Sequence, residues 1–405
     1  MEQKTEKKPE KKKKPQHHVL ARHRFYFCFL RFVGVIVGWV YGCHYQIFRG
    51  KRGQNYFILA NHQTLLDPAI LAMSFRAPVY FVAGETLFNN TLPSRFLRHC
   101  FAPIKKRKGE ADVASIRSMV RVAREGGNVA LFPEGNRTWA DFPFYIDPAI
   151  CSLIRMLKLP LLLYRFEGGY GVDPRWGRKR RKGSFRACVY RELSVEKIAA
   201  MSDEVLYRTV IDGLTVADGE SGFHYISEKR AEYLERLLFI CPMCGQVSSL
   251  RSEGAQVHCD HCHLSVTYNE DLSLSSENAE FPFKTLKEWY AYQLECIKSM
   301  NPKPGAAIYR DKKTVLYDKT GEKRVKIAKG ECVLTPETLR VCENEIPLSE
   351  ICSVSVVGGR KLVFHAKDRF YILTGGDRFN AIKYAFTFNV LPTSIKNEKY
   401  YGLDI

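Results

Sequence analysis

Short apolar runs alternate with segments of helical periodicity between about residues 49 and 191. Each apolar run has the length of a buried strand, and the segments at 111–125 and 147–157 place their apolar residues on one helix face. The runs expected to form strands are 56–60, 79–83, 128–132, 159–166 and 185–190. This alternation predicts an α/β fold with a mainly parallel sheet flanked by helices.

Residues 25–45 precede this region, are nearly all apolar, and would form a helix of about 31 Å, close to the thickness of a bilayer core. Arg31 inside it would cost on the order of 2.5–3.5 kcal/mol at the bilayer centre. A clean span and a short or tilted membrane-embedded helix are therefore both open, with a buried core helix as the third alternative. The basic tail at 1–24, expected to be disordered, favours the cytoplasmic face of a membrane, because basic residues stay on that side and attract anionic lipid.

Residues 303–405 differ in pattern, with seven or more short β-rich runs followed by one helix at 378–389. The pattern predicts a small β-barrel-like domain with a closing helix, which faintly resembles the pleckstrin-homology or GRAM-like fold in its strand count and terminal helix. A module that binds lipid or protein and a plain structural or dimerisation domain both remain open. Further helices are expected at 202–213, 227–239 and 283–300.

Charge narrows the choice of partner, because 62 lysine and arginine residues outnumber 43 acidic residues and leave a formal net charge of +19. Such a chain is expected to meet a polyanionic surface, either nucleic acid or anionic lipid. The basic run at 175–182 could stack Trp176 on a nucleic-acid base, bind lipid headgroups or the phosphates of a donor, or form a solvated loop. The 13 scattered cysteines favour a reducing cytoplasm over a disulfide framework.

Two CxxC pairs, Cys241 with Cys244 and Cys259 with Cys262, have 14 residues between them. Two such turns can place four thiolates at the corners of a tetrahedron, the geometry of a structural zinc site that leaves no position open for catalysis. The pairs predict a zinc ribbon, a segment with too few apolar residues to fold without its metal. Unpaired reactive cysteines or a disulfide pair are the alternative.

His62 and Asp67 lie five positions apart, between a strand-like and a helix-like segment. A carboxylate that accepts a hydrogen bond from one imidazole nitrogen fixes the tautomer and leaves the other nitrogen free to take a proton. The two residues are therefore a candidate general base with its orienting acid. The alternative is that Asp67 only caps the helix that begins at Pro68.

Two further groups of polar residues follow expected strands. Glu134, Gly135 and Arg137 come on a tight turn directly after a strand, at the rim where open parallel sheets bind ligands. A guanidinium there suits bidentate phosphate binding. Lys105 and Arg107 belong to a basic loop that could add phosphate contacts. Taken alone, the turn could carry a solvated charge pair and the loop could be a solvated surface.

The order and spacing of these elements resemble the glycerolipid acyltransferase family, whose best-known members acylate lysophosphatidic acid. The segment at 61–67 is similar to that family's histidine, four residues, aspartate block, and the segment at 132–138 is similar to its Phe-Pro-Glu-Gly-x-Arg block. Residues 159–163 fit its proline-containing block, and the resemblance covers roughly residues 25–215.

The resemblance implies acyl transfer, with His62 as general base on the acceptor hydroxyl and Asp67 orienting it. The donor would be acyl-CoA or acyl carrier protein. The acceptor would be a lysophospholipid, with 1-acylglycerol 3-phosphate giving phosphatidic acid as the best match. The substrate-binding residues expected from the resemblance are Glu134, Gly135, Arg137, Arg107 and Lys105.

Three departures from the family pattern, Asn136, Phe101 and Ile104, leave the acceptor contacts open. A non-catalytic membrane or nucleic-acid adaptor on the same scaffold is the second hypothesis, although the family implies membrane phospholipids rather than nucleic acid as partner. The oligomeric state is not determined. The expected domains are a basic tail at 1–24, a membrane-associated helix at 25–48, an acyltransferase domain at 49–235, a zinc ribbon at 236–268, a helical linker at 269–302 and a β-rich domain at 303–405.

Overall fold

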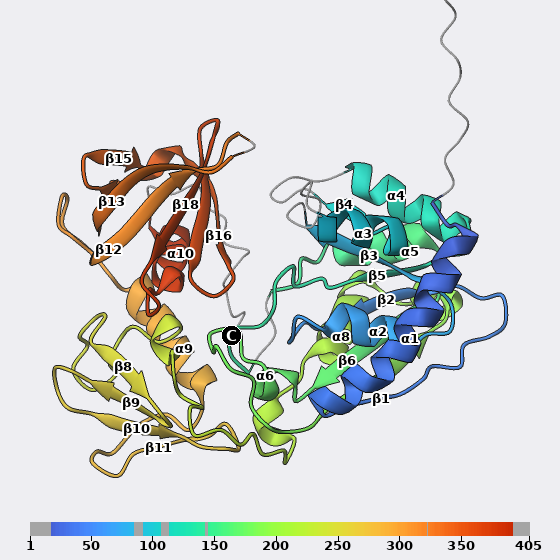
Figure 1. Cartoon of the computed structure of the whole chain (residues 1–405), viewed down its shortest axis with the longest axis horizontal. Helices are drawn as coiled ribbons and strands as arrows, with labels where there is room; N and C mark the ends of the chain where they lie inside the picture. The colour runs from blue at the N-terminus through green and yellow to red at the C-terminus, as the bar shows by residue number, and fades with distance from the viewer. Residues whose placement is uncertain (1–17, 85–91, 107–112, 142–144, 322, 392–405) are drawn as a thin grey trace, which may run out of the picture.

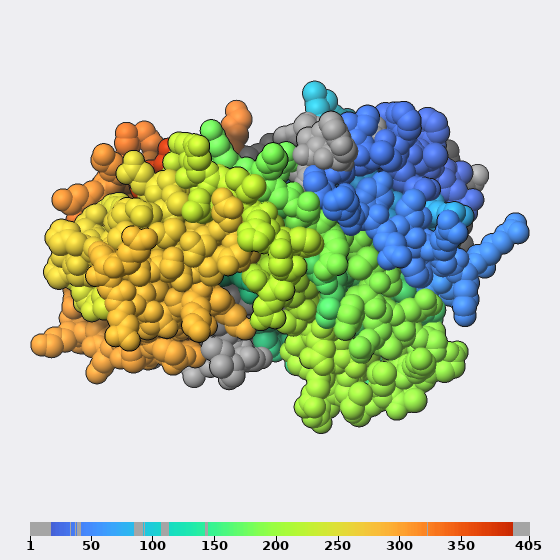
Figure 2. Space-filling view, turned by 90° about the horizontal axis from the view of Figure 1, so that it is seen from below, coloured from blue at the N-terminus to red at the C-terminus, as the bar shows by residue number. Residues whose placement is uncertain are grey.

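The computed structural model describes residues 18–84, 92–106, 113–141, 145–321 and 323–391. An N-terminal α/β part, a small antiparallel sheet and a C-terminal β domain follow one another along the chain (Figure 1). Seen from below, the α/β part in blue and green lies beside the other two parts in yellow and orange (Figure 2). Most of the predicted basic tail lies outside the described residues.

A seven-stranded sheet forms the centre of the α/β part, in the order β1-β7-β6-β2-β5-β3-β4. Neighbouring strands are parallel except β6 and β7, so the predicted mainly parallel sheet is confirmed. The strands are β1 Cys43–Tyr45, β2 Phe57–Ala60, β3 Val79–Gly84, β4 Ile104–Lys106, β5 Asn128–Leu131, β6 Leu161–Glu167 and β7 Phe185–Leu193.

Helices cover both faces of this sheet, because its central strands are apolar on both sides. Successive residues of a strand point to opposite faces. Phe57 and Leu59 of β2 therefore share one core with α4, α5 and α8, while Ile58 and Ala60 share the other with α2. The helices of this part are α1 Ala21–Tyr41, α2 Asp67–Met73, α3 Leu92–Phe101, α4 Val113–Arg124, α5 Ile150–Leu157, α6 Gly169–Val172, α7 Val195–Ala200 and α8 Asp203–Leu214.

The N-terminal helix differs from its prediction in both of its limits. It begins at Ala21, within the expected tail, and ends at Tyr41 rather than continuing through the segment predicted at 25–48. Gly42 ends it with a φ of +62°, a conformation that glycine adopts at little cost, and the chain continues as β1 beside β7. Of the helices in the described ranges, none combines the length and apolarity needed to cross a membrane, which contradicts the clean span, one of the three alternatives for this helix.

The cysteine segment forms an antiparallel sheet of four short strands in the order β11-β10-β9-β8. The helix predicted at 227–239, just before this sheet, does not form. That stretch consists of turns and a single 3₁₀ turn, Leu234–Arg236, which Tyr233 precedes with a φ of +75°. The predicted linker helix is α9, Leu286–Lys298, which begins with a capping box of Thr285 and Glu288. The strands are β8 Leu250–Glu253, β9 Gln256–Cys259, β10 Ser265–Tyr268 and β11 Leu274–Ser275.

The predicted combination of short strands and one closing helix forms in the C-terminal domain, where a seven-stranded antiparallel sheet packs against the buried helix α10 (Ala381–Val390) (Figure 1). The order β15-β14-β13-β12-β18-β17-β16 has no pairing between its two outer strands within the described chain, so the sheet is open rather than a closed barrel. Its strands are β12 Tyr309–Asp318, β13 Val325–Leu334, β14 Thr338–Val341, β15 Asn344–Pro347, β16 Ile351–Val357, β17 Lys361–Ala366 and β18 Arg369–Gly375.

Candidate active site and cysteine cluster

The two residues of the predicted dyad touch. His62 follows the end of β2, Asp67 is the first residue of α2, and His62 Nδ1 lies 2.9 Å from Asp67 Oδ2. Because a carboxylate can only accept, Nδ1 carries the shared hydrogen and Nε2 is left to accept a proton. The N-cap of α2 is Leu66, without a side-chain cap hydrogen bond. The carboxylate of Asp67 turns back to the preceding loop, so the alternative of a helix cap is wrong.

The Asp67 carboxylate is fully buried and held from several sides. Oδ2 accepts hydrogen bonds from the backbone N–H groups of Gln63, at 2.6 Å, and Thr64, at 2.9 Å. Oδ1 accepts the hydroxyl of Thr64 at 2.5 Å. These hydrogen bonds fix the position of the carboxylate before any substrate arrives. Asp67 is therefore placed to orient the His62 imidazole.

The predicted turn after β5 lies directly against His62. Because β2 and β5 are parallel neighbours, both chains leave the sheet at the same rim. Glu134 is buried and accepts the backbone N–H of His62 through Oε1 at 3.1 Å, while the His62 ring stacks on Phe132 with centroids 4.3 Å apart. Gly135 has a φ of +69°, which a turn this tight reserves for glycine.

Arg137 is bound to the protein more extensively than its predicted phosphate role requires. Its Nε donates to the carbonyl of Gln63 at 3.0 Å, and Nη2 donates to the carbonyl and carboxylate of Asp173 at 2.7 and 3.1 Å. Within the described chain, only Nη1 of the guanidinium has no hydrogen bond. Arg137 thus ties the His62 loop to the segment after α6, and one nitrogen remains for a ligand.

Of the two basic residues predicted to add phosphate contacts, the structure describes only Lys105, and it lies on a different strand from the His62 loop. Lys105 is exposed on the edge strand β4, and β3 separates that strand from β5. Arg107 lies outside the described residues, so its place in the site stays a prediction. A small hollow does adjoin the dyad, lined by Asn61, His62, Gln63, Glu134, Thr138, Leu214 and Val216.

Gln63 and Asp218 were not identified from sequence, although they support the dyad loop. Gln63 donates through Nε2 to Asp218 Oδ1 at 3.0 Å and accepts the Gly169 N–H through Oε1 at 2.8 Å. Asp218 is fully buried and also accepts the Gly168 N–H at 2.7 Å. Gln63 lies within the recognisable block, but Asp218 is 155 residues away and carries no local signal.

The pKa of Asp218 is raised to about 7, first by burial and then by the nearby carboxylate of Asp141. A carboxyl whose pKa is higher in the folded than in the unfolded chain binds extra protons on folding between the two pKa values. We therefore expect the contribution of Asp218 to stability to decline as the pH rises from about 4 to about 7. In the Asp218→Asn variant this decline should be smaller, as measured by urea unfolding at several pH values. An equal slope in both proteins would mean that Asp218 does not titrate in this window.

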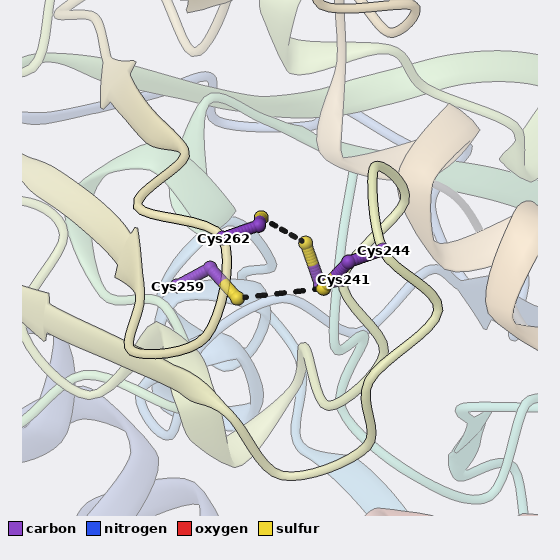
Figure 3. Close-up of side chains that lie close together, drawn as sticks. All are labelled: Cys241, Cys244, Cys259 and Cys262. Atoms are coloured by element: carbon purple, nitrogen blue, oxygen red, sulfur yellow. Dashed lines mark hydrogen bonds between the residues drawn. The ribbon is translucent and has the colours of Figure 1, made fainter.

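The four predicted metal ligands also come together (Figure 3). The sulfur atoms of Cys241, Cys244, Cys259 and Cys262 all lie within 4.8 Å of one another, with 3.6 Å between Cys241 and Cys262 and 3.8 Å between Cys244 and Cys259. A tetrahedral zinc with bonds of about 2.3 Å has sulfur–sulfur edges of about 3.8 Å. A disulfide would need about 2.05 Å. The four thiols therefore fit one metal ion and are not disulfide-bonded.

Comparison with known proteins supports an acyltransferase domain, the class of protein that the fold and the His62–Asp67 dyad indicate. The Acyltransferase family model matches residues 45–190, which contain the dyad and the Glu134 turn and make up less than half of the chain. The chain is 25% identical over 166 residues to the 1-acyl-sn-glycerol-3-phosphate acyltransferase of Bacillus subtilis (strain 168), covering 38% of this chain and 78% of the relative.

Among solved structures, the 1-acyl-sn-glycerophosphate (LPA) acyltransferase PlsC of Thermotoga maritima is similar to this chain at 16% identity and a TM-score of 0.41. The superposition covers 47% of this chain and 77% of that one. The family match ends before the cysteine segment and the C-terminal domain begin. The family match and the Bacillus subtilis relative support an acyltransferase domain in the α/β part. The predicted zinc ribbon and pleckstrin-homology-like domain stay predictions.

Proposed function

We propose that this chain transfers a fatty acyl group from acyl-CoA or acyl carrier protein to the free hydroxyl of a lysophospholipid, with 1-acylglycerol 3-phosphate as acceptor and phosphatidic acid as product. The observation that carries the proposal is the His62–Asp67 pair, preorganised at the sheet rim beside the Glu134 turn. The similarity to the Bacillus subtilis enzyme supports the choice of acceptor.

In the proposed reaction, His62 Nε2 takes the proton of the acceptor hydroxyl while the oxygen attacks the thioester carbonyl. The carbon–oxygen bond forms, the carbon–sulfur bond breaks, and the proton held by His62 passes to the leaving thiolate. Asp67 accepts a hydrogen bond from Nδ1 throughout, so it stabilises the imidazolium that forms transiently. The acceptor oxygen is the nucleophile, so no acylated side chain is needed.

The acceptor would bind through the turn and the remaining basic groups. Glu134 and Gly135 are placed to meet its glycerol part, and Nη1 of Arg137 would donate to its phosphate. Arg107 and Lys105 keep the phosphate role that the family resemblance implies, as part of this proposal. Product analysis of a mixed lysolipid pool, offered with both donors, tests acceptor and donor together. Acylation of every lysolipid but lysophosphatidic acid would reject the proposed acceptor and keep the reaction type.

The second candidate is a non-catalytic adaptor on an acyltransferase scaffold, and the basic surface of the chain favours it. The dyad argues against it, because a loop without catalytic use does not need four hydrogen bonds to one buried carboxylate. Release of free thiol from acyl-CoA, measured with and without lysophosphatidic acid, separates the two. Absence of any thiol release above the uncatalysed rate would favour the adaptor.

We further propose that α1 rests on the cytoplasmic face of a membrane. Phe25, Phe29, Phe32 and Ile36 form a stripe at helical spacing and are 59–74% exposed, whereas Phe27 on the other side is buried. The neighbouring helix α3 adds Leu92 and Phe96, which are 80% and 62% exposed. An apolar surface of this kind, on a basic protein, suits the interface of an anionic bilayer.

Replacing Phe29 and Phe32 together by serine is expected to weaken binding to vesicles of phosphatidylcholine and phosphatidylglycerol by at least about tenfold. Each phenylalanine side chain that becomes buried in the bilayer contributes about 1.5–3 kcal/mol to binding. Vesicle co-sedimentation measures the effect. The matched control is Val205→Ser with Val325→Ser, two exposed apolar residues on other elements. Equal binding by all three proteins would show that α1 does not contact lipid.

We also propose that Cys241, Cys244, Cys259 and Cys262 hold a structural zinc ion. The ion would fix the two turns that frame β8 and β9, and it would take no part in acyl transfer, because four thiolates fill its coordination shell. The repeated backbone pattern supports this: the N–H of Gly245 donates to the carbonyl of Cys241 at 2.9 Å, and the N–H of His263 donates to that of Cys259 at 3.0 Å.

A further inference from the structure

A second hollow, of about 190 Å³, lies between the loop that follows α6 and the turns before the cysteine segment. It shares no lining residue with the hollow at His62. Five of its lining residues are cations and one is an acid: Arg178, Lys179, Arg181, Lys229 and Arg230, with Glu232. The basic run that stood out in the sequence therefore contributes to a concave site.

Most of this charge is not neutralised by the protein. Lys229 pairs with Glu232 at 3.1 Å, and Arg178 pairs with Asp377 of the C-terminal domain at 2.5 Å. Within the described ranges, no ion pair joins Lys179, Arg181 or Arg230 to a carboxylate. The hollow keeps a net positive charge, and its walls include the low-dielectric rings of Trp176 and Tyr233.

Arg181 is the most informative of these cations because it is only 3% exposed. Its Nη1 and Nη2 donate to the carbonyls of Gly171, at 3.2 Å, and Arg230, at 2.7 Å. The guanidinium lies 5.1 Å from the Trp176 ring centroid and 5.0 Å from that of Tyr268. Carbonyls and rings orient this cation without cancelling its charge, and a buried cation is costly until an anion meets it.

Tyr233 also lines the hollow, and arginine side chains surround its ring. The Tyr233 ring carries three guanidinium groups, with centroid distances of 4.9 Å for Arg178, 4.1 Å for Arg236 and 6.0 Å for Arg378. Burial, together with the charges of Arg178 and Arg360, lowers the pKa of Arg236 to about 10. Its Nη2 is buried and has no hydrogen-bond partner in the described structure. Arg378 pairs with Glu235 at 2.6 Å, and neither Arg236 nor Arg378 lines the hollow, so they act on it only through their electrostatic field.

Trp176 decides which kind of anion the site suits. The sequence left open that it stacks on a nucleic-acid base, but it is only 1% exposed and its indole N–H donates to the Tyr170 hydroxyl at 3.2 Å. Arg181 covers its face. A base could reach it only by unpacking the core, so single-strand stacking, which needs an exposed ring, is disfavoured. A compact anion with several acceptor oxygens matches the hollow better.

We propose that this hollow binds a phosphate-bearing anion, with Lys179 and Lys229 closing over it from the two sides of its mouth and Arg178 and Arg181 as fixed charges in its wall. A lipid headgroup and a soluble phosphate share this chemistry. The site is separate from the proposed acyl transfer, so neither proposal depends on the other.

The test uses the full chain and inorganic pyrophosphate as the probe, with binding measured by titration calorimetry. The Lys179→Gln, Lys229→Gln double variant should bind pyrophosphate at least about tenfold more weakly than the parent, because two charge-assisted hydrogen bonds are lost. Both lysines are exposed, so the fold should be kept. The matched control removes two exposed lysines elsewhere, Lys197→Gln with Lys326→Gln, and should bind within about twofold of the parent. No binding by the parent, or equal weakening in both double variants, would overturn the proposal.

Two further arms identify the source of the phosphate. Vesicles of phosphatidylcholine are compared with and without a tenth of phosphatidic acid. If phosphatidic acid increases vesicle binding by the parent but not by the Lys179, Lys229 variant, the ligand is a lipid headgroup. If the increase is the same in both proteins while the variant binds pyrophosphate more weakly, the ligand is a soluble phosphate. A single-stranded RNA that needs both lysines and is not displaced by pyrophosphate would overturn the proposal in favour of nucleic acid.

Discussion

Replacing His62 by alanine is expected to lower the rate of acyl transfer by about 10²–10⁴-fold, the usual contribution of a positioned general base. The fold should survive, because Asp67 keeps its hydrogen bonds from Gln63 and Thr64 when the imidazole is removed. Thiol release from acyl-CoA measures the rate, and thermal unfolding monitors the fold.

The matched control for this variant is His224→Ala, which removes an exposed histidine that lies outside the dyad loop. It should transfer acyl groups at the parent rate. Activity of His62→Ala near that of the parent, with both proteins folded, would contradict the assignment of His62 as the base. Loss of activity together with early unfolding would assign His62 a structural role instead.

Replacing Cys241 by serine is expected to remove zinc from the protein and to unfold the sheet formed by β8 to β11. The metal contributes about 10–16 kcal/mol in small domains of this kind, far more than so short a sheet can supply by packing. The cores of this sheet and of α9 are continuous, through Leu250, Val257 and Trp289, so α9 should loosen as well.

Two measurements check this expectation. Elemental analysis should find about one zinc per parent chain and almost none in the variant, and hydrogen exchange should speed up across β8 to β11. Cys352→Ser is the control, because Cys352 lies in the C-terminal domain and outside the cluster. Parent protein that contains no zinc when purified without chelator, and that keeps its exchange protection, would refute the metal site.

The main architecture could be predicted because its signals are local and repeated. The predicted strand runs at 56–60 and 128–132 become β2 and β5, whose residues are buried on both faces. Continuous apolar runs of this length, separated by amphipathic segments, have few alternatives to a covered parallel sheet. The helix at 202–213 and the closing helix of the C-terminal domain were predictable for the same reason.

The helix predicted at 227–239 fails because long-range contacts outweigh its periodicity. Ala231 N–H donates to the carbonyl of Gly254, and Arg236 donates to the carbonyls of Trp176 and Asp377. A helix through this stretch would break these bonds and move Tyr233 out of its arginine cluster. Tertiary contacts override intrinsic helix propensity, which amounts to under about 1 kcal/mol per residue.

Sequence by itself determined which residues form the candidate dyad and the cysteine cluster, because the spacing of His62 and Asp67 and of the cysteines within each CxxC pair is set by short-range backbone geometry. The tertiary structure alone decided which distant groups the other side chains contact. It bound Arg137 to Asp173, placed Gln63 on Asp218, and assembled the basic hollow from segments about 50 residues apart. Such contacts follow from how sheets and loops pack to bury their apolar surface, and no local pattern in the chain specifies which distant groups then meet.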